Sequence, residues 1–389
     1  MLRLPSYVKD TTDFINKLRN IKLQSKNTYL VTLDVSSLYT NIPHTDGTDA
    51  CLYYLRQGNN NSRLSSDEIV KLLKLILENN YFKFGDDYFL QKMGTAMGSP
   101  VAPAYAALFM GKFEEEFLKD SQLKPSLWLR FLDDIFMLWD HSLEELNTFI
   151  DKINNVHPSI KFTHTISQQS VSFLDVQVSK GKSYELQTNV YVKETNNHQY
   201  LDYTSCHPKR CKDGIPHSQA KRYRRIISDD DVFSTSLSKL REFFISRNFP
   251  ETVIDSAFLH VSQMSQEDAL RPQDKEKKNV LPFIVTYNPS LPNIGNTIHK
   301  YWDLLNLSKN EGVKNIHNNY TPIIAYKRPR NLQDFLVRSR FDTDSDFTSH
   351  SGGCCRKRCS HCVRINSDLR QLVFGITHIM HDNVLASKV

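Results

Sequence analysis

The chain has 389 residues, of which 40% are hydrophobic and 11% aromatic, so it can form two or three domains and is too apolar to be mainly disordered. No stretch approaches the roughly 18 apolar residues of a membrane span, and the first residues lack the apolar segment of a secretory signal. The net charge is +6. We therefore expect an intracellular protein that does not associate with membranes.

The first 200 residues predict alternating strands and helices. A β-rich apolar run covers 27–39, a capping box of Ser65 and Glu68 begins a helix over 65–82, two short strands cover 81–90, and a helix follows Pro100. Further predicted elements are two apolar strands over 127–139, a helix begun by the capping box of Ser142 and Glu145, and strands over 161–167, 171–178 and 184–193. This order predicts an α+β fold with an antiparallel sheet packed against helices.

Beyond this region the composition changes and suggests further domains. The pattern predicts helices over 215–263 and a small segment of strands and helices over 280–341, with polar linkers over 265–279 and 342–353. The expected organisation is a first domain over 1–205, a basic helical segment over 206–264, a linker over 265–279, a further segment over 280–341, and a linker with a Cys-rich tail over 342–389.

Three aspartates stand among apolar strand residues. Asp34 lies at the end of one predicted strand, and Asp133 and Asp134 lie between two others. Carboxylates so close to a core must be paired, hydrogen-bonded or metal-bound. A hairpin carrying two aspartates beside a strand carrying a third can gather them at one sheet edge, where Mg²⁺ and substrate phosphates would complete a two-metal site.

A double aspartate is weak support by itself, because it also forms ordinary acidic hairpin turns. The sequence contains its own control in Asp86 and Asp87, which follow Gly85 between aromatic strands. The order of the surrounding motifs must therefore decide which pair carries chemistry.

That order is informative. DVSSLYTNIP begins at Asp34, GTAMGSPVAP precedes the alanine-rich helix, and FLDDIF, IKFT and FLDV follow. A strand with an acidic end, a Gly-Ser-Pro turn into a helix and then an Asp-Asp hairpin is the order of a polymerase palm. The pattern resembles the reverse transcriptases, most closely those of Penelope-like retroelements, over roughly residues 6–350. The Gly85 turn precedes the Gly-Ser-Pro motif, so it stands in the wrong place to be catalytic.

The resemblance implies roles for individual residues. Asp34 and Asp133 would hold two Mg²⁺ or Mn²⁺ ions, with Asp134 beside them. Tyr39 would exclude a ribose 2′-hydroxyl and so favour dNTPs, although an ordinary core tyrosine is the alternative. Two further sites would bind the nucleotide: Gly98 and Ser99 would lie against the nascent base pair, and Lys161, unless it is a simple surface lysine, would lie near the triphosphate.

A basic segment follows the last predicted strand. Residues 206–226 contain seven basic residues and one acid, which is either a solvated face or a phosphate-binding surface. In the family this region leads into helices described as helix-turn-helix-like, at the exit of the primer–template duplex. We expect contacts to nucleic acid from two residues at its start and three near the head of a helix, namely Lys209, Arg210, Arg222, Arg224 and Arg225.

Both ends of the chain raise separate expectations. Cys355, Cys359 and Cys362, with Cys354 or His361, could close a tetrahedral Zn²⁺ site, although all lie on one short segment. In the family a similar segment precedes a GIY-YIG nuclease, which has no counterpart here, and little of the fingers region precedes Asp34. The resemblance thus implies a chain truncated at both ends, with weak or no activity.

The function implied by the resemblance is RNA-directed DNA polymerase activity, by two-metal nucleotidyl transfer onto a primer 3′-end. The expected partners are an RNA template, a DNA primer and dNTPs. A non-catalytic nucleic-acid-binding remnant and an RNA-templated RNA polymerase are the alternatives. The sequence leaves the oligomeric state open.

Overall fold

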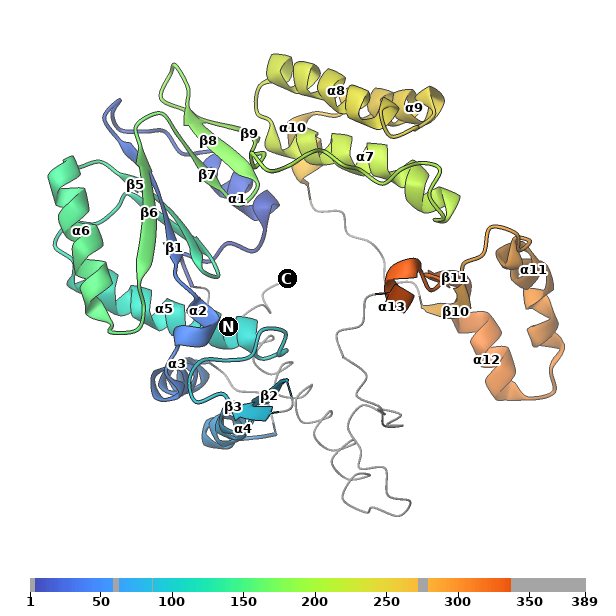
Figure 1. The fold of residues 1–389 in the computed structure, drawn as a ribbon, viewed down its shortest axis with the longest axis horizontal. Helices are drawn as coiled ribbons and strands as arrows, with labels where there is room; N and C mark the ends of the chain where they lie inside the picture. The colour runs from blue at the N-terminus through green and yellow to red at the C-terminus, as the bar shows by residue number, and fades with distance from the viewer. Residues whose placement is uncertain (1–3, 59–62, 86, 272–278, 337–389) are drawn as a thin grey trace. The chain divides into compact units, whose positions relative to one another are not determined.

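The structure is a computed structural model that describes residues 4–58, 63–85, 87–271 and 279–336. Contacts divide the described chain after Tyr191 into two compact units, which Figure 1 shows in colours from blue to orange. Among the described helices, none combines the length and the apolar character that a bilayer span needs. Asp86, the 342–353 linker and the Cys-rich segment with its predicted Zn²⁺ ligands lie outside the described residues.

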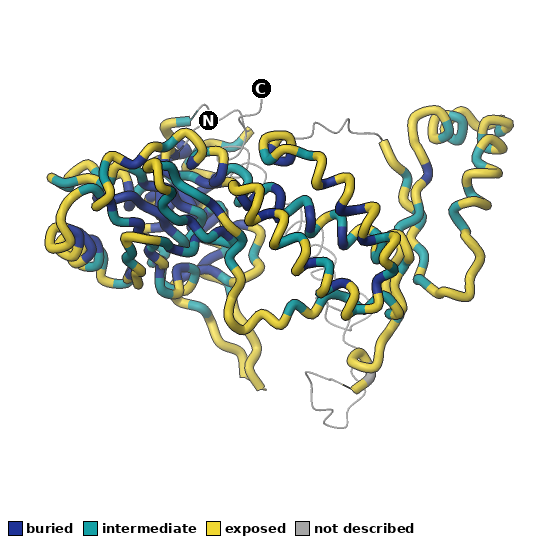
Figure 2. The backbone as a smooth tube through the Cα atoms, turned by 90° about the horizontal axis from the view of Figure 1, so that it is seen from above, coloured by how far each residue is buried: buried dark blue, intermediate teal, exposed yellow. Residues whose placement is uncertain are grey.

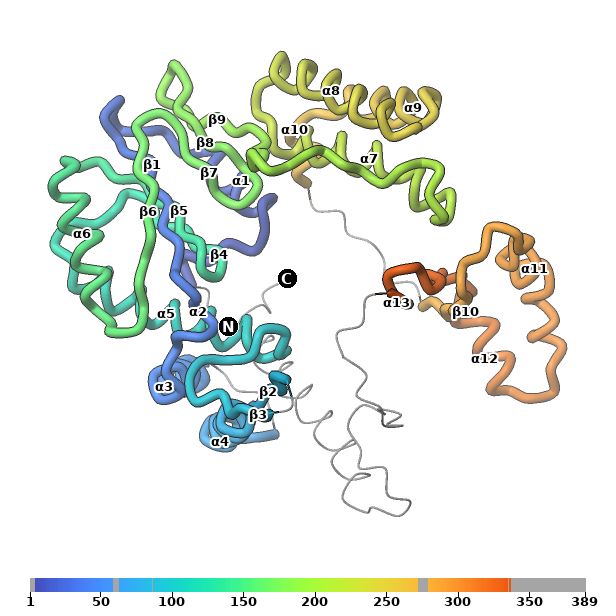
Figure 3. Tube along the Cα trace, in the orientation of Figure 1, coloured from blue at the N-terminus to red at the C-terminus, as the bar shows by residue number. Residues whose placement is uncertain are grey.

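The first unit mixes helices and strands in the predicted order, and Figure 3 traces its path. Its helices are α1 (Thr11–Leu18), α2 (Leu38–Asn41), α3 (His44–Gln57), α4 (Ser66–Glu78), α5 (Ala102–Asp120) and α6 (Leu143–Val156). Its strands are β1 (Tyr29–Val35), β2 (Tyr81–Phe84), β3 (Asp87–Leu90), β4 (Leu127–Phe131), β5 (Asp134–Trp139), β6 (Phe162–Ser167), β7 (Ser170–Phe173), β8 (Val176–Lys180) and β9 (Leu186–Val190).

Four strands form the central sheet in the order β4-β5-β1-β6, and every neighbouring pair is antiparallel. The register of β1 on β5 runs from Tyr29 opposite Trp139 to Asp34 opposite Asp134. Strands β7, β8 and β9 form a separate antiparallel sheet. The expectation of an antiparallel sheet packed with helices is confirmed.

Both faces of the central sheet are covered. On one face, Val31 and Leu33 of β1 share a buried cluster with aromatic residues of α5 and α6. On the other face, Phe136 of β5 packs against Phe14 of α1 and Phe173 of β7, with ring centroids 5.3 and 5.9 Å away. Figure 2 shows buried segments concentrated in this part of the chain. Such ring pairs add to the stabilisation by apolar burial and fix the strands between two layers.

The helix starts follow the predicted local chemistry. Ser65 and Ser142 each accept a hydrogen bond from the backbone N–H three residues later, and the glutamates at those positions bond back to the serine N–H groups. Both capping boxes are thus confirmed, because each satisfies two backbone donors that a helix start leaves unpaired.

The segment 171–178, predicted as one strand, is two. Leu174 adopts the left-handed conformation with φ 55°, and the chain turns back through Leu174 and Asp175 so that Phe173 pairs with Val176. Leu132, with φ 54°, forms the same kind of two-residue loop with Asp133. Leucine is a poor residue for this conformation, so neither loop carries the glycine or asparagine by which such turns are recognised.

A buried ion pair anchors the second of these loops. Arg130 of β4 is fully buried, and its Nε donates to Oε1 of Glu114 in α5 at 2.7 Å. Glu114 also accepts from Ser6 Oγ at 2.7 Å and from Trp128 Nε1 at 2.9 Å. Arg130 Nη1 donates to the carbonyl oxygen of Leu132 at 3.0 Å. One guanidinium thereby ties α5 and the N-terminal segment to the hairpin loop.

The β2–β3 hairpin stands out by its exposure, because all eight of its strand residues are exposed. Phe82 and Phe89 stack across the hairpin at 5.6 Å between ring centroids. The hairpin leads through Gln91, whose N–H donates to the Asn80 carbonyl at 2.9 Å, into the segment that precedes α5.

The second unit begins with a helical group. Its helices are α7 (Lys209–Ile226), α8 (Asp230–Ile245), α9 (Glu251–Ser262) and α10 (Gln266–Leu270). The first helix begins at Lys209 rather than near 215, because Pro208 occupies its N-cap position and Pro216 is accommodated inside. A small apolar core of these helices includes Tyr223, Phe233, Leu240, Phe244 and Phe258.

Residues 280–336 contain a parallel pair of strands with short helices. Strands β10 (Val280–Thr286) and β11 (Thr321–Lys327) are joined by α11 (Ile294–Tyr301), a 3₁₀ helix (Trp302–Leu307) and α12 (Glu311–Asn319), and the short helix α13 (Leu332–Leu336) follows. No residue of α11, the 3₁₀ helix or α12 is buried in the described structure. Phe283 and Trp302 pack edge to face at 6.2 Å.

Replacing Arg130 by Leu should cost about 3–5 kcal/mol of unfolding free energy, because Glu114 would remain buried without its cation. The double variant Arg130→Leu/Glu114→Leu should recover part of that loss. Urea unfolding of the three proteins measures both values.

The matched control is the exposed ion pair between Arg56 and Asp67, whose atoms lie 3.0 Å apart. Replacing Arg56 by Leu should change stability by less than about 1 kcal/mol. Equal losses at Arg130 and Arg56 would show that the buried pair has no special role.

Candidate active site and nucleic-acid interface

The three predicted aspartates lie at the same end of the two central strands. Asp34 is directly opposite Asp134 in the β1–β5 ladder, and the two residues are 100 positions apart in the chain. Asp133 is next to Asp134 in the hairpin loop, and its carbonyl accepts from the Val35 N–H at 3.2 Å. Residues directly opposite in a ladder share a face, so the Asp34 and Asp134 side chains project on the same side.

The electrostatics reflect this crowding. Loss of water around Asp34, followed by the negative charge of Asp133, raises the pKa of the Asp34 carboxyl above its ordinary value. The same two causes raise the pKa of Tyr39, which is half-buried. Asp133 is therefore close enough to influence both Asp34 and Tyr39. A site of this kind gains stability from a cation, because like charges repel across a ladder.

The carboxylates fit a divalent metal only together with other oxygen ligands. Within the residues that the structure describes, no three His, Cys, Asp or Glu side chains are gathered closely enough to hold a metal ion on their own. Mg²⁺ is commonly bound by one or two protein carboxylates, with substrate phosphates and water completing its shell. Asp34 and Asp134 facing each other in the ladder, with Asp133 alongside, match that kind of incomplete donor set.

The nucleotide-site candidates Gly98 and Ser99 lie in the turn before α5, where the Ser99 N–H donates to the Ala96 carbonyl at 3.1 Å. Gly98 has φ +91°, a conformation that favours glycine, but no protein atom lies within 4 Å of the position its Cβ would take. The positive φ by itself favours glycine at this position. The expected place of Gly98 and Ser99 against the nascent base pair stays a prediction.

The Lys161 amine is hydrogen-bonded to main-chain carbonyls of the protein. Its Nζ donates to the carbonyl oxygens of Asn154 at 2.5 Å and His157 at 3.3 Å, at the C-terminal end of α6. A lysine at this end of a helix satisfies carbonyls that have no partner within the helix and stabilises the helix dipole. No described contact tests its expected proximity to a triphosphate.

The three predicted arginine contacts do not lie at the head of a helix. Arg222, Arg224 and Arg225 belong to the last turns of α7, because that helix begins at Lys209 and ends at Ile226. Cations are favourable at this end through the helix dipole. The sequence indicated the basic segment correctly but placed these arginines at the wrong end of the helix.

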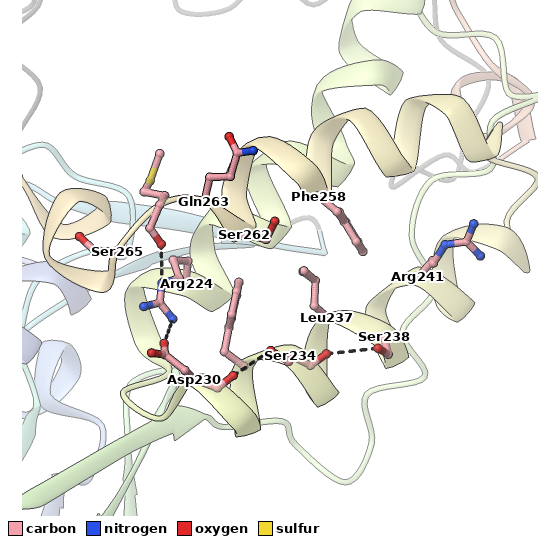
Figure 4. A pocket seen from close by; sticks show the side chains of 12 residues that line it. Arg224, Asp230, Ser234, Leu237, Ser238, Arg241, Phe258, Ser262, Gln263 and Ser265 are labelled. Atoms are coloured by element: carbon pink, nitrogen blue, oxygen red, sulfur yellow. Dashed lines mark hydrogen bonds and ion pairs between the residues drawn. The ribbon is translucent and has the colours of Figure 1, made fainter.

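Arg224 is a structural residue rather than an open phosphate ligand. It is 7% exposed, its Nη1 lies 2.6 Å from Asp230 Oδ1, and its Nε donates to the Met264 carbonyl at 2.9 Å. Figure 4 shows these bonds at the edge of a hollow between α8 and α9. Arg225 Nε similarly donates to the Ala269 carbonyl at 2.9 Å. Both side chains hold α10 and its approach against α7.

Lys209 and Arg210, in the first turn of α7, remain exposed. Lys209 Nζ lies 2.6 Å from Asp213 Oδ2, one helical turn later, while its side chain keeps 75% of its surface in solvent. Exposed cations of this kind can contact phosphates without leaving a buried group unpaired. They are the stronger phosphate candidates among the five predicted basic residues.

Sequence reasoning gave no role to three residues that support the site. Arg130 directly precedes the FLDDIF motif and was given no role, although a cation inside an apolar strand signals a buried partner. Gly94 and Thr95 were also passed over, and they pack directly on the turn that carries Tyr39. A second glycine four residues before Gly98 was the available signal for this contact.

Comparisons with known families agree with this geometry. Residues 3–164 match the family described as reverse transcriptase (RNA-dependent DNA polymerase), and residues 199–259 match the animal helix-turn-helix domain. The telomerase reverse transcriptase of rice, Oryza sativa subsp. japonica, is 31% identical over 103 residues, which is 23% of this chain and 8% of that protein.

Two solved polymerase structures also match this chain, at lower sequence identity. A Candida albicans telomerase, solved with a fragment of telomeric RNA, has a TM-score of 0.47 and 9% identity, over 67% of this chain and 45% of that one. The RNA-dependent RNA polymerase of a human picobirnavirus has a TM-score of 0.41 and 14% identity, over 62% of this chain and 45% of that one.

The two family matches coincide with the two kinds of structure described above. The first covers β1, β4, β5 and the start of β6, including the three aspartates, and the second covers α7, α8 and most of α9. The chain therefore contains a reverse transcriptase domain over residues 3–164, followed by an animal helix-turn-helix domain over residues 199–259.

Proposed function

We propose that this chain is the RNA-directed DNA polymerase of a Penelope-like retroelement and adds deoxynucleotides to a primer 3′-end on an RNA template. The observation that carries the proposal is the pairing of Asp34 with Asp134, with Asp133 alongside, inside a reverse transcriptase domain. The Penelope-like assignment is supported by the order of the DVSSLYTNIP, GTAMGSPVAP, FLDDIF and FLDV motifs.

Asp34 and Asp133, with Asp134 beside them, would hold two Mg²⁺ or Mn²⁺ ions, which would activate the primer hydroxyl and stabilise the pyrophosphate leaving group. Tyr39, half-buried beside Asp133, would fill the space that a ribose 2′-hydroxyl needs. Arg130 would act through the loop that carries Asp133 and would keep that carboxylate in place. Such fixed positioning accounts for much of the rate in nucleotidyl transfer.

The helix-turn-helix domain would hold the primer–template duplex by contacts to its phosphates. The support for this role is the family match together with the exposed first turn of α7. Because phosphate contacts are largely independent of sequence, we propose binding without marked base preference. A chain that binds nucleic acid in this way but never extends a primer would be a non-catalytic remnant.

The central test is template-directed dNTP incorporation on an RNA template with a DNA primer, in Mg²⁺ and again in Mn²⁺. Asp133→Asn should lower incorporation by at least about 10²-fold, because a metal-binding carboxylate is lost. Asp87→Asn is the matched control, since Asp87 belongs to the other double aspartate of the sequence and should leave the rate unchanged.

Two results would reject the catalytic proposal. One is duplex binding without any incorporation by the unaltered chain, and the other is an equal loss in both variants. Preference for NTPs over dNTPs would instead indicate an RNA-templated RNA polymerase.

A second prediction concerns stability and metal. Without divalent ions, Asp34→Asn should raise the unfolding free energy by about 0.2–1 kcal/mol, because it removes a like charge opposite Asp134. Added Mg²⁺ should raise the melting temperature of the unaltered chain more than that of the variant. Differential scanning fluorimetry measures both, and an equal Mg²⁺ effect in the two proteins would contradict a metal bound by Asp34.

The pH dependence has a definite sign. Because the pKa of Asp34 is raised above 3.8 in the folded chain, its ionisation lowers stability at neutral pH. That penalty should be complete above the folded pKa and should disappear as the pH falls through it toward 3.8. The stability advantage of Asp34→Asn should therefore shrink in acid.

A third prediction separates phosphate contacts from internal bonds. Replacing Lys209 and Arg210 together by Ala should flatten the log–log dependence of duplex affinity on salt by about 2, because two contacts to phosphate are lost. Arg224→Ala should instead destabilise the chain by about 1–3 kcal/mol through its lost internal bonds. Fluorescence anisotropy measures the salt dependence, and urea unfolding measures the stability. If Arg224→Ala flattened the salt dependence without loss of stability, while the double variant left the salt dependence unchanged, Arg224 would be a phosphate contact.

A further inference from the structure

The turn that carries Tyr39 is fastened to the segment before α5 by main-chain bonds. The Thr95 N–H donates to the Tyr39 carbonyl oxygen at 2.6 Å, and the Gly94 N–H donates to the Ile42 carbonyl oxygen at 2.9 Å. His44 Nε2 donates to the Gly94 carbonyl oxygen at 2.8 Å. Thr95 is 4% exposed, so its contact is shielded from water. We name this group of contacts the backbone clamp.

Gly94 permits the clamp to close. It has φ +74°, and a Cβ at this position would lie 2.6 Å from Cα of Thr40 and closer still to the Tyr39 carbonyl oxygen. All of these obstructing atoms belong to the backbone, which cannot rotate away as a side chain can. Any side chain at Gly94 would therefore push the two segments apart.

The same turn is also bonded to the segment that follows α6. The Ser36 N–H donates to the Lys161 carbonyl oxygen at 2.8 Å, and Ser159 Oγ donates to the Asn41 carbonyl oxygen at 2.7 Å. Within the turn, Asn41 Nδ2 donates to the Ser36 carbonyl oxygen at 3.0 Å. With these bonds added to those of the clamp, the backbone of Tyr39 has little freedom to move.

We propose that Gly94 and Thr95 are positioning residues that set the sugar specificity of the site, because they fix the position of the Tyr39 backbone and hence of its ring. The inference rests on the proposed function, in which Tyr39 fills the space of a 2′-hydroxyl. Steric exclusion of a ribose depends on the distance between the Tyr39 ring and the sugar, because the two substrates differ by only one oxygen atom. Displacing the turn by a few tenths of an ångström or more would open room for that oxygen.

The experiment compares incorporation of dCTP and CTP opposite a template guanine, as the ratio of the two kcat/KM values. Gly94→Ala should lower this ratio on the order of 10-fold, since shifts of about 1 Å can alter rates by ~10². Tyr39→Ala gives the ratio without the ring. Gly85→Ala is the matched control, because Gly85 also has positive φ (+62°) but has open space around it.

A milder variant guards against a failure to fold. His44→Ala removes one bond of the clamp without a steric clash, and it should lower the ratio in the same direction by a smaller factor. The proposal is overturned if folded Gly94→Ala and His44→Ala both keep the original ratio. It is also overturned if Gly85→Ala lowers the ratio as much as Gly94→Ala does.

A readout independent of activity separates this inference from the proposed function. In chains with ¹³C-labelled tyrosine, the Tyr39 ring signal is assigned by its loss in Tyr39→Phe. It should move in Gly94→Ala and stay in place in Gly85→Ala. If the unaltered chain incorporates neither nucleotide, the proposed function fails, while a moved signal still supports the clamp. An unmoved signal in Gly94→Ala overturns the clamp whatever the activity.

Discussion

The buried contact between Arg130 and Glu114 is the interaction on which the active-site end of the sheet depends. Burying two charges is costly unless each finds its partners, and here Ser6, Trp128 and the Leu132 carbonyl complete the network. The contact joins a helix, a strand and the N-terminal segment at one point. It also supports a leucine in a left-handed conformation, which would otherwise be unfavourable. The neighbouring Asp133 is therefore held by a network that extends well beyond its own hairpin.

Local chemistry made much of the first unit predictable. Capping boxes at Ser65 and Ser142 and the apolar strands around Asp133 follow from short sequence patterns, and the structure has them where expected. The pairing of Asp34 with Asp134 required more, because periodicity does not specify which strands are neighbours. There the order of motifs, compared with a known family, supplied the information that spacing lacks.

What could not be predicted depends on tertiary contacts. The hairpin loop at Leu174 has no glycine or asparagine, so sequence rules read through it as a single strand. The arginines at the end of α7 looked like a surface for phosphates, but Arg224 is enclosed by Asp230 and Met264. Charge in the sequence shows which residues are basic. Only the packing of α8, α9 and α10 shows which of them are already engaged.

The backbone clamp is made almost wholly of main-chain atoms, and this has a consequence for how such a site can evolve. The Tyr39 side chain can be exchanged without removing the main-chain bonds that the clamp makes to the turn. A lineage could therefore try different residues at position 39, and hence different sugar preferences, on an unchanged support. Gly94 is the exception, since any larger residue there would disturb the support itself. Selection would thus allow substitutions at position 39 and remove them at position 94, because the glycine at position 94 keeps the support of position 39 unchanged.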